Sequence, residues 1–304
     1  MYRKERLNKR PVFILGFSRG GTNILLNFLL SHPDLCGPGG EFHQVLRRKL
    51  GDDWLTFTRK SLEYLSVWLM ERQDVLSARN WQRRTQLTFY TQRQIDRALY
   101  FGKIKARKPG QNLFKSEGVP YAEAEIKQSR LLCKVPDGNI LLSEELLRIY
   151  PDATFIGLVR NGFAVAEGHI RRGAEVEQIA EKYDKGCQWM IENSRTIPNF
   201  HLLRYEDCVA EPVNTLFSAL ELIGADSAVI KKVRLETKQV INKTGEHEYV
   251  RSADGKKVIW YAPDEIAKHF RKDANENQIA RLTSEQKKII LRIAKRSLKY
   301  FNYI

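Results

Sequence analysis

The first strong pattern in the chain is an apolar run that ends in a glycine-rich turn and continues as an amphipathic helix. Residues 12–15 are all apolar, which predicts a short strand buried on both faces. The segment 16–21 is rich in glycine and favours a turn, because it cannot continue a strand or a helix cheaply. From Thr22 apolar residues recur every three or four positions, which predicts a helix that ends at residues 31–34.

The same alternation of apolar runs and amphipathic stretches returns later in the chain and predicts parallel βαβ units. Strands are expected at 129–136, 153–159 and 199–204, with helices at 139–150, 175–196, 212–223, 263–271 and 283–300. Residues 45–128 are basic and helix-rich. We therefore predict an α/β fold with a central parallel sheet, helices on both faces, and a helical excursion after the first βα unit.

A glycine-rich turn between a strand and a helix is typical of a phosphate site, since backbone N–H groups and the helix N-terminus face the anion. Gly16 and Gly21 have the spacing of a nucleotide triphosphatase loop, G-x-x-x-x-G-K-[ST]. However, Thr22 and Asn23 occupy its Lys and hydroxyl places, and the cation lies inside the loop as Arg19. The pattern indicates a phosphate-containing donor bound without a metal, and a turn with no ligand is the alternative.

The net charge of the chain says more about its possible ligands than its amino-acid composition does. The 304 residues carry a net charge of +15, which favours anionic ligands. Nucleic acid, an anionic donor with an acidic acceptor, and a merely solvated basic surface all remain open. No apolar run approaches the roughly 18 residues of a membrane span. The cysteines lack C-x-x-C spacing, so a reduced cytoplasmic chain is the simplest expectation; they are Cys36, Cys133, Cys187 and Cys208.

The loop at residues 16–23 resembles a known sequence motif. It is similar to G-x-P-R-S-G-T-T of sulfotransferases that use 3′-phosphoadenosine-5′-phosphosulfate (PAPS). Ser18, Gly20 and Asn23 stand where that motif has Pro, Ser and Thr. The resemblance implies that the loop holds the 5′-phosphosulfate of PAPS. The residues concerned are Arg19, Gly20, Gly21, Thr22 and Asn23.

Two later motifs resemble the same family and occur in the family's order. Residues 150–166 resemble F-P-x-A-K-F-I-x-x-x-R-D-G-R-A-V, which binds the 3′-phosphate of the donor, with Arg160 on the Arg of that pattern. Residues 203–212 closely resemble L-R-Y-E-D-L-V-x-x-P, and Tyr205 then lies beside the adenosine. Together the motifs resemble PAPS-dependent sulfotransferases, nearest to the Golgi-type, tyrosylprotein and carbohydrate enzymes. The resemblance implies a P-loop-like sulfotransferase fold.

One position departs from the family in the predicted 3′-phosphate site. The family has a second phosphate ligand, a Ser, where this chain has Gly168. The hydroxyl is lost, and His169 and Arg171 are the nearby candidates to replace it. This half of the predicted donor site therefore lacks one of the family's phosphate ligands.

The resemblance also assigns the catalytic side chains. Residues 31–41 resemble an H-P-D-x-x-x-G-E passage, with a slightly longer glycine segment. In that passage the Glu is the base, so Glu41 is expected to take the proton of the acceptor. His43 is the second candidate for the base, and Glu41 could instead serve as the N-terminal anion of the next helix. Lys134, near the end of a predicted strand, is expected to contact the sulfonyl or bridging oxygens, with Arg19 as the third catalytic residue. A surface lysine is the alternative for Lys134.

A basic loop near the C-terminus resembles, loosely, the loop that covers the donor in the family. Arg251, Lys256 and Lys257 are expected to close over the 3′-phosphate, and a mobile surface loop is the alternative. The chain is thus expected to be a single domain, 1–304. Its parts are a phosphosulfate-binding unit (11–44), an acceptor-side excursion (45–128), a core with the 3′-phosphate site (129–224) and C-terminal helices with the donor-covering loop (225–304).

The predicted reaction is sulfonyl transfer from PAPS to a hydroxyl or amine acceptor, without a metal. The expected partners are PAPS and an acidic glycan, peptide or small molecule, and neither a membrane span nor nucleic acid is favoured. A P-loop kinase, a basic nucleic-acid-binding protein and an inactive relative of the family remain as alternatives. The sequence specifies neither the acceptor nor the oligomeric state.

Overall fold

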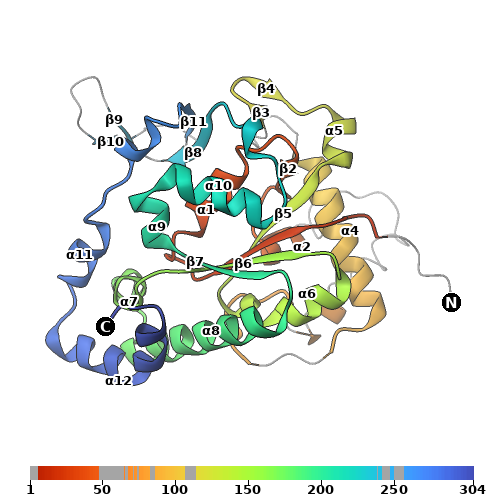
Figure 1. The fold of residues 1–304 in the computed structure, drawn as a ribbon. Helices are drawn as coiled ribbons and strands as arrows, with labels where there is room; N and C mark the ends of the chain where they lie inside the picture. Colours follow the sequence, from red (N-terminus) through yellow and green to blue (C-terminus); the bar gives the residue numbers. More distant parts are fainter. Residues whose placement is uncertain are drawn as a thin grey trace.

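A five-stranded parallel sheet forms the centre of the molecule (Figure 1). Its strand order is β2-β5-β1-β6-β7. The strands are β1 (Val12–Gly16), β2 (Leu35–Cys36), β5 (Arg130–Pro136), β6 (Thr154–Val159) and β7 (Phe200–Arg204). This confirms the predicted α/β fold. The computed structural model of the chain describes residues 6–47, 65, 68–70, 72–73, 75–82, 86–106, 114–237, 239–241, 247–249 and 257–304.

The register of the sheet brings three strand ends to one edge. β1 lies between β5 and β6, with Gly16 opposite Pro136 on one side and Leu158 on the other. Since all three strands are parallel, their carboxyl ends meet at the same edge, where open α/β sheets bind their ligands. The loop that follows Gly16 therefore starts beside Lys134 of β5 and beside Arg160, which directly follows β6.

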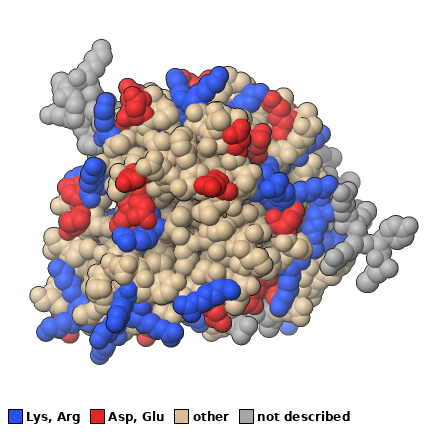
Figure 2. Space-filling view, in the orientation of Figure 1, with Lys and Arg blue, Asp and Glu red and all other residues tan. Residues whose placement is uncertain are grey.

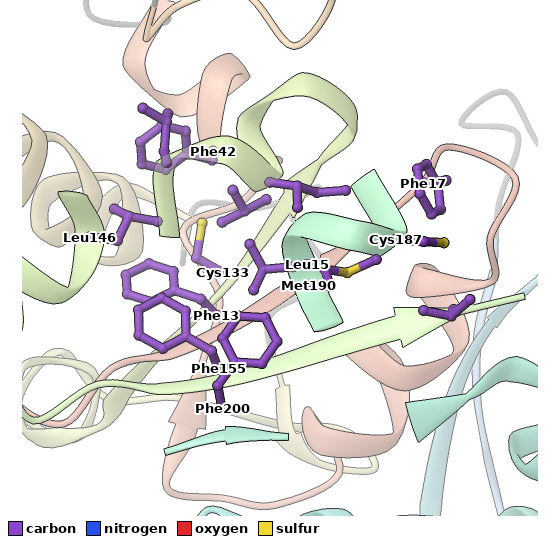
Figure 3. Packing of buried hydrophobic residues seen from close by; sticks show 14 of the residues in the cluster. Phe13, Leu15, Phe17, Phe42, Cys133, Leu146, Phe155, Cys187, Met190 and Phe200 are labelled. Carbon is purple, nitrogen blue, oxygen red and sulfur yellow. The ribbon is translucent and has the colours of Figure 1, made fainter. Parts of the chain in front are cut away.

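The side chains of β1 divide between two apolar layers, one on each face of the sheet. Val12 and Ile14 pack in the layer beneath α1 (Thr22–Leu29) and α10 (Pro212–Leu222). Phe13 and Leu15 point to the opposite layer, where the rings of Phe13, Phe155 and Phe200 follow one another at 5.5 and 5.8 Å (Figure 3). The second layer is covered by α4 (Phe89–Lys105), α6 (Ser143–Ile149), α8 (Val176–Thr196) and α12 (Ser284–Tyr300). A strand without polar alternation is buried on both faces, as its pattern predicts.

The described part of the excursion after the first βα unit contains helices and a short hairpin. It contains α2 (Phe42–Arg47), α4 and α5 (Glu123–Gln128), and also a short hairpin of β3 (Phe114–Ser116) and β4 (Val119–Pro120). Buried Asp96 ties α4 to the core, because its carboxylate accepts from the Leu7 N–H at 2.9 Å and from the Tyr150 hydroxyl at 3.0 Å.

The remaining segments differ more from the prediction. The expected helix at 139–150 begins as a 3₁₀ helix, η2 (Asp137–Leu142), and a short helix, α9 (Tyr205–Ala210), follows β7 at once. The expected helix at 263–271 is only the 3₁₀ turn η4 (Ile266–His269), and α11 (Ala274–Ile279) lies beyond it. β8 (Val233–Thr237) pairs with β11 (Lys257–Tyr261), and β9 (Gln239–Ile241) with β10 (His247–Tyr249). The other elements are α7 (Gly162–Ile170) and η3 (Ser227–Val229).

Charged side chains of both signs are spread over the face of the molecule in Figure 2. Lys and Arg gather at the lower left of that view, where Figure 1 places α12. Among the described residues, no helix is both long enough and apolar enough to cross a membrane.

Candidate active site

The loop between β1 and α1 has the backbone geometry of an anion-binding turn. Gly21, at the N-cap of α1, has a φ of 84°, and the Gly20 N–H donates to the Phe17 carbonyl at 2.9 Å. Within the described chain, the first turn of α1 has neither a side-chain cap nor an acidic residue, so its N-terminus retains partial positive charge. Only glycine fits at position 21, because a Cβ there would lie 2.1 Å from Cδ2 of Tyr205.

Ser18 fixes the near side of this loop to two other elements. Its N–H and its hydroxyl donate to the two carboxylate oxygens of Asp137 at 2.7 and 2.5 Å. Asp137 directly follows β5 and has a φ of 52°, a conformation that non-glycine residues rarely adopt. On the other side, His169 Nε2 donates to the Ser18 carbonyl at 3.0 Å. The serine that departs from the family motif is therefore a point where β5 and α7 hold the loop.

Lys134 joins the loop to the predicted catalytic carboxylate. Its ammonium lies 2.6 Å from Asn23 Oδ1 and 2.7 Å from Glu41 Oε1. The Lys134 side chain is 10% exposed and that of Glu41 is 27% exposed, so the pair is only partly screened by water. Asn23 itself is exposed at the start of α1. Asn23, Glu41 and Lys134, which are far apart in the sequence, thus form one group beside the loop, in which Lys134 contacts the other two.

Glu41 directly precedes α2, which accounts for one of its contacts. Its backbone N–H donates to the Gln44 side-chain oxygen at 3.2 Å, an interaction typical of a helix start. The carboxylate, however, contacts Lys134, and its second oxygen lies 3.8 Å from Nδ1 of His43. The structure therefore gives Glu41 a place at the start of a helix and also a carboxylate directed to the predicted catalytic lysine.

His43 is the second titratable group on this side of the loop. Burial lowers its pKa below the usual 6.5, and the nearby Glu41 carboxylate only partly offsets that effect. The ring is therefore neutral at pH 7. Its Nδ1 is buried and makes no hydrogen bond among the described residues. A neutral imidazole beside the carboxylate is able to accept a proton, which is consistent with its place as the second candidate base.

Arg160 lies on the other side of the loop and is 7% exposed. Its Nη1 donates to the Arg19 carbonyl at 2.8 Å, its Nε donates to Asn275 Oδ1 at 2.8 Å, and its Nη2 donates to Gln278 Oε1. Burial lowers its pKa from the usual 12.5, while Tyr205 and the acidic residues near it act in the opposite direction. The guanidinium is thus engaged by protein acceptors on three of its nitrogen atoms.

Tyr205 packs between Arg160 and the loop. The Arg160 guanidinium carbon lies 4.3 Å from the centre of the Tyr205 ring, and the edge of the ring touches Gly21. The ring is 9% exposed. In this position the Tyr205 ring packs against the loop at Gly21, and little of the ring remains exposed for a nucleotide base to stack on.

Gly168 lies beneath Arg19. A Cβ at position 168 would lie 3.2 Å from Cβ and 3.1 Å from Cγ of Arg19, so the missing side chain makes room for the arginine stem. The two residues suggested as replacements for the lost hydroxyl have other contacts. His169 binds Ser18, and Arg171 pairs with Glu167 at 3.1 Å.

Most of the predicted donor-covering loop lies outside the described residues. Arg251 and Lys256 lie outside the described residues. The backbone of Lys257 pairs with Thr237 in the β8–β11 hairpin, and its side chain lies outside the described part of the structure.

The predicted residues therefore form two groups, one on each side of the loop 16–23. One group comprises Asn23, Lys134 and Glu41, with His43 beside them. The other group comprises Arg160, Gly168 and Tyr205. Arg19 lies between the two: its stem rests on Gly168 and its side chain is exposed.

Sequence reasoning missed the residues that fix the two groups in place. Asp137 carries no motif, although an Asp-Gly pair straight after a strand signals a turn. Asn275 and Gln278 lie in a polar segment, ANENQI, whose single isoleucine gives no apolar periodicity to predict the helix α11. Their spacing of three residues places them on one face once the helix is known. Within the described residues, no group of three or more His, Cys, Asp or Glu side chains could hold a metal ion.

Comparison with known proteins gives one strong match. A profile of the Sulfotransferase family matches residues 11–228, a range that contains the loop, Lys134, Arg160 and Tyr205. A search of curated protein sequences finds no match.

Several solved structures have a similar chain trace over most of this chain. The sulfotransferase domain of the Synechococcus PCC 7002 olefin synthase is 18% identical, covers 97% of each chain, and has a TM-score of 0.47. The sulfotransferase domain from the curacin biosynthetic pathway is 17% identical over 95% of this chain and 99% of its own, with a TM-score of 0.45. A sulfotransferase from Mycobacterium avium is 11% identical over 96% of this chain and 76% of its own, with a TM-score of 0.44.

Proposed function

Because the chain belongs to the sulfotransferase family, we propose that it transfers a sulfonyl group from PAPS to a hydroxyl or amine acceptor. The observation that supports this most strongly is the contact of Lys134 with both Asn23 and Glu41, at 2.6 and 2.7 Å. That contact joins the phosphate-binding loop to a carboxylate able to take a proton. Sulfonyl transfer needs both features side by side.

The loop is well suited to the 5′-phosphosulfate end of the donor. The N-terminus of α1 and the backbone N–H groups of the turn offer hydrogen bonds to an anion, and no acidic residue of the first helical turn opposes it. The exposed Arg19 supplies a positive charge at the same place. These groups would stabilise the negative charge that grows on the departing phosphate.

The step balances without a further reactant. The acceptor oxygen or nitrogen forms a bond to sulfur, and the bond between sulfur and the bridging oxygen of the 5′-phosphate breaks. The electron pair leaves with adenosine 3′,5′-bisphosphate, and the acceptor proton passes to Glu41. Since Lys134 binds Glu41 Oε1, the other carboxylate oxygen remains for the proton. The Lys134 ammonium also lies close enough to the loop to attract the sulfonyl or bridging oxygens.

The contacts of Asn23 argue against the kinase alternative. Asn23 stands where a nucleotide triphosphatase has the hydroxyl that binds magnesium. Here its side-chain oxygen accepts from an ammonium at 2.6 Å, and a magnesium ion at that oxygen would be repelled by Lys134.

The remaining features bear on the acceptor and the compartment. The net charge of +15 supports an acidic acceptor, whether a glycan, a peptide or a small molecule. All four cysteines are buried free thiols, which supports a reducing compartment such as the cytoplasm.

The proposal is tested with PAPS labelled with radioactive sulfur and a panel of hydroxyl and amine acceptors, in buffer containing EDTA. We expect label on at least one acceptor with the wild-type protein and at least about 100-fold less with Glu41→Gln, because a general base contributes on that order. Labelling that requires added magnesium, or transfer of phosphate from ATP to the same acceptors, would contradict the proposal.

A further inference from the structure

Arg160 makes hydrogen bonds both to the loop and to the short helix α11. One nitrogen donates to the carbonyl of Arg19, and the other two donate to the side-chain oxygens of Asn275 and Gln278. All three acceptors are uncharged groups of the protein. The guanidinium is therefore held in one orientation, with its face against the Tyr205 ring at 4.3 Å.

Each of the two α11 amides is itself held by a carboxylate. Asn275 Nδ2 donates to Glu206 Oε1 at 2.6 Å, and Gln278 Nε2 donates to Glu167 Oε2 at 2.9 Å. The Glu167 side chain is only 4% exposed. Each amide thus links Arg160 to a carboxylate through two successive hydrogen bonds. The negative charges of Glu206 and Glu167 therefore offset the positive charge of Arg160.

The loop residue that Arg160 contacts is in a strained conformation. Arg19 has a φ of 68°, in the left-handed region that costs an L-residue roughly 1–2 kcal/mol. Such conformations persist only where the surroundings enforce them, and they often mark functional sites. Here Arg160 holds the carbonyl of Arg19, and Gly168 leaves space for its Cβ and Cγ. The absence of a side chain at Gly168 and the hydrogen bond from Arg160 therefore both help to hold Arg19 in this conformation.

Helix α11 has few other reasons to lie where it does. None of its residues is buried, so apolar packing contributes little to its position. Among the described residues, the side-chain hydrogen bonds from α11 to the core are those of Asn275 and Gln278, and Arg281, just beyond the helix, also reaches Glu167 at 3.4 Å.

We propose that Arg160, Asn275 and Gln278 form a loop clamp, in which Arg160 is a positioning residue for the phosphosulfate loop and acts through the Arg19 carbonyl. Arg160 is then not the ligand of the donor's 3′-phosphate. A phosphate bound to Arg160 would displace both amides and remove one hydrogen-bond donor from Glu206 and one from Glu167. The loss is costly mainly at Glu167, whose side chain is only 4% exposed. This inference rests on the proposed function, which assigns the loop to the phosphosulfate.

A pair of nucleotides distinguishes a clamp from a phosphate ligand. Adenosine 3′,5′-bisphosphate and adenosine 5′-monophosphate are titrated by calorimetry into the wild type and into the double variant Asn275→Ala/Gln278→Ala. If the clamp positions the loop, the double variant binds both nucleotides about 10-fold more weakly, and the ratio of the two affinities is unchanged. Arg160→Lys should likewise weaken both nucleotides by a common factor, because a lysine cannot hold the Arg19 carbonyl and both amides.

Two results overturn the clamp. One is a loss confined to the bisphosphate in Arg160→Lys, which would make Arg160 a ligand of the 3′-phosphate. The other is tighter binding of the bisphosphate to the double variant, which would mean that the amides compete with the phosphate. Asn277→Ala is the matched control, since Asn277 lies on the same helix and its side chain bonds only to Asp273 among the described residues. It should leave both affinities unchanged.

Hydrogen exchange tests the clamp without any nucleotide. The double variant should raise exchange in the peptide that covers residues 16–24 and leave β6 and β7 unchanged. Equal exchange in the loop of both proteins would overturn the clamp. If neither nucleotide binds the wild type, the proposed function fails, and the exchange experiment still decides whether the clamp exists.

Discussion

At the level of single residues, the site depends on one ammonium shared by two oxygen acceptors. Lys134 contacts the amide oxygen of Asn23 and the carboxylate of Glu41, and its own side chain is nearly buried. Removing one partner of a poorly hydrated ion pair destabilises a protein by more than the pair itself stabilises it, because the remaining charge is left unsatisfied. Substitutions here should therefore be chosen to keep an oxygen beside the ammonium.

Glu41→Gln meets that condition and isolates the role of the base. The glutamine oxygen can still accept from Lys134, but the side chain can no longer take a proton. We expect the rate at saturating donor to fall by about 100- to 10,000-fold, the usual contribution of a general base. The dissociation constant of adenosine 3′,5′-bisphosphate should change little. Glu117→Gln, which alters a surface carboxylate paired with Lys232, is the control. A normal rate in Glu41→Gln would assign the base to another residue, with His43 the first to examine.

Arg19 allows charge and backbone strain to be separated. Arg19→Gly and Arg19→Ala both remove the guanidinium, and both should abolish sulfonyl transfer. Only glycine relieves the φ of 68°, so Arg19→Gly should be more stable than Arg19→Ala by about 1 kcal/mol in urea unfolding. Equal stability of the two variants would mean that the left-handed conformation carries no strain, and transfer by either would remove Arg19 from the catalytic group.

At the level of elements, the strand–loop–helix unit at 12–29 supports the site through its close packing against α9. The ring of Tyr205, the first residue of α9, touches Gly21 at the N-cap of α1. The carboxyl end of β7 thereby supports the loop that follows β1.

Gly21→Ala should disrupt this contact in two ways. The new Cβ would lie 2.1 Å from the Tyr205 ring, and the φ of 84° is strained for alanine. Gly173→Ala is the matched control, because Gly173 has a φ of 88° and nothing within 4 Å of its Cβ position. We expect Gly173→Ala to lose about 1 kcal/mol of stability. Gly21→Ala should lose roughly 1–3 kcal/mol more, as overpacked sites do, together with nucleotide binding. Equal losses in the two variants would mean that the loop moves away from Tyr205 without cost.

Some of the strands and helices could be predicted from the sequence, and others could not. Apolar runs predicted β1, β5, β6 and β7 to within one or two residues. The reason is clearest for β1 and β6, which are buried along their whole length and are almost entirely apolar. β8 and α11 were not predicted. β8 is a short strand whose partner follows about twenty residues later, and α11 is held by polar side chains that leave no periodic signal.

In the candidate site, too, some features could be predicted from the sequence and others could not. Glu41 could be named from a motif and Lys134 from its place near the end of a predicted strand. Their contact is consistent with the pairing of β5 with β2, the strand that precedes Glu41. The contacts of Arg160 could not be anticipated, since they depend on α11, more than a hundred residues away in the sequence.

At the level of the whole molecule, the basic excursion is joined to the core by a buried lysine. Lys103 of α4 is 1% exposed and donates to the Ser129 carbonyl, just before β5, at 2.5 Å. Burial lowers its pKa from 10.5 to about 8. The native chain therefore binds fewer protons than the unfolded chain between pH 8 and 10.5, so this group makes stability rise with pH in that window.

Lys103→Met removes that dependence. Relative to the variant, the wild type should gain up to about 3 kcal/mol of unfolding free energy between pH 8 and pH 10.5. Below pH 8 the difference between the two proteins should no longer change with pH. Urea unfolding of both proteins across this range measures it, and parallel curves would show that Lys103 has an ordinary pKa.

In the proposed reaction, the loop at 16–23 binds the anionic end of an adenosine phosphosulfate donor with the charge of Arg19 and without a metal. Calorimetric titration of adenosine 3′,5′-bisphosphate into the wild type and into Arg19→Ala, in EDTA, tests it most directly. We expect one nucleotide bound per wild-type chain and at least about 10-fold weaker binding to the variant, since a charge-assisted hydrogen bond contributes on that scale. Binding of ATP that requires magnesium, with no heat from the bisphosphate, would contradict it.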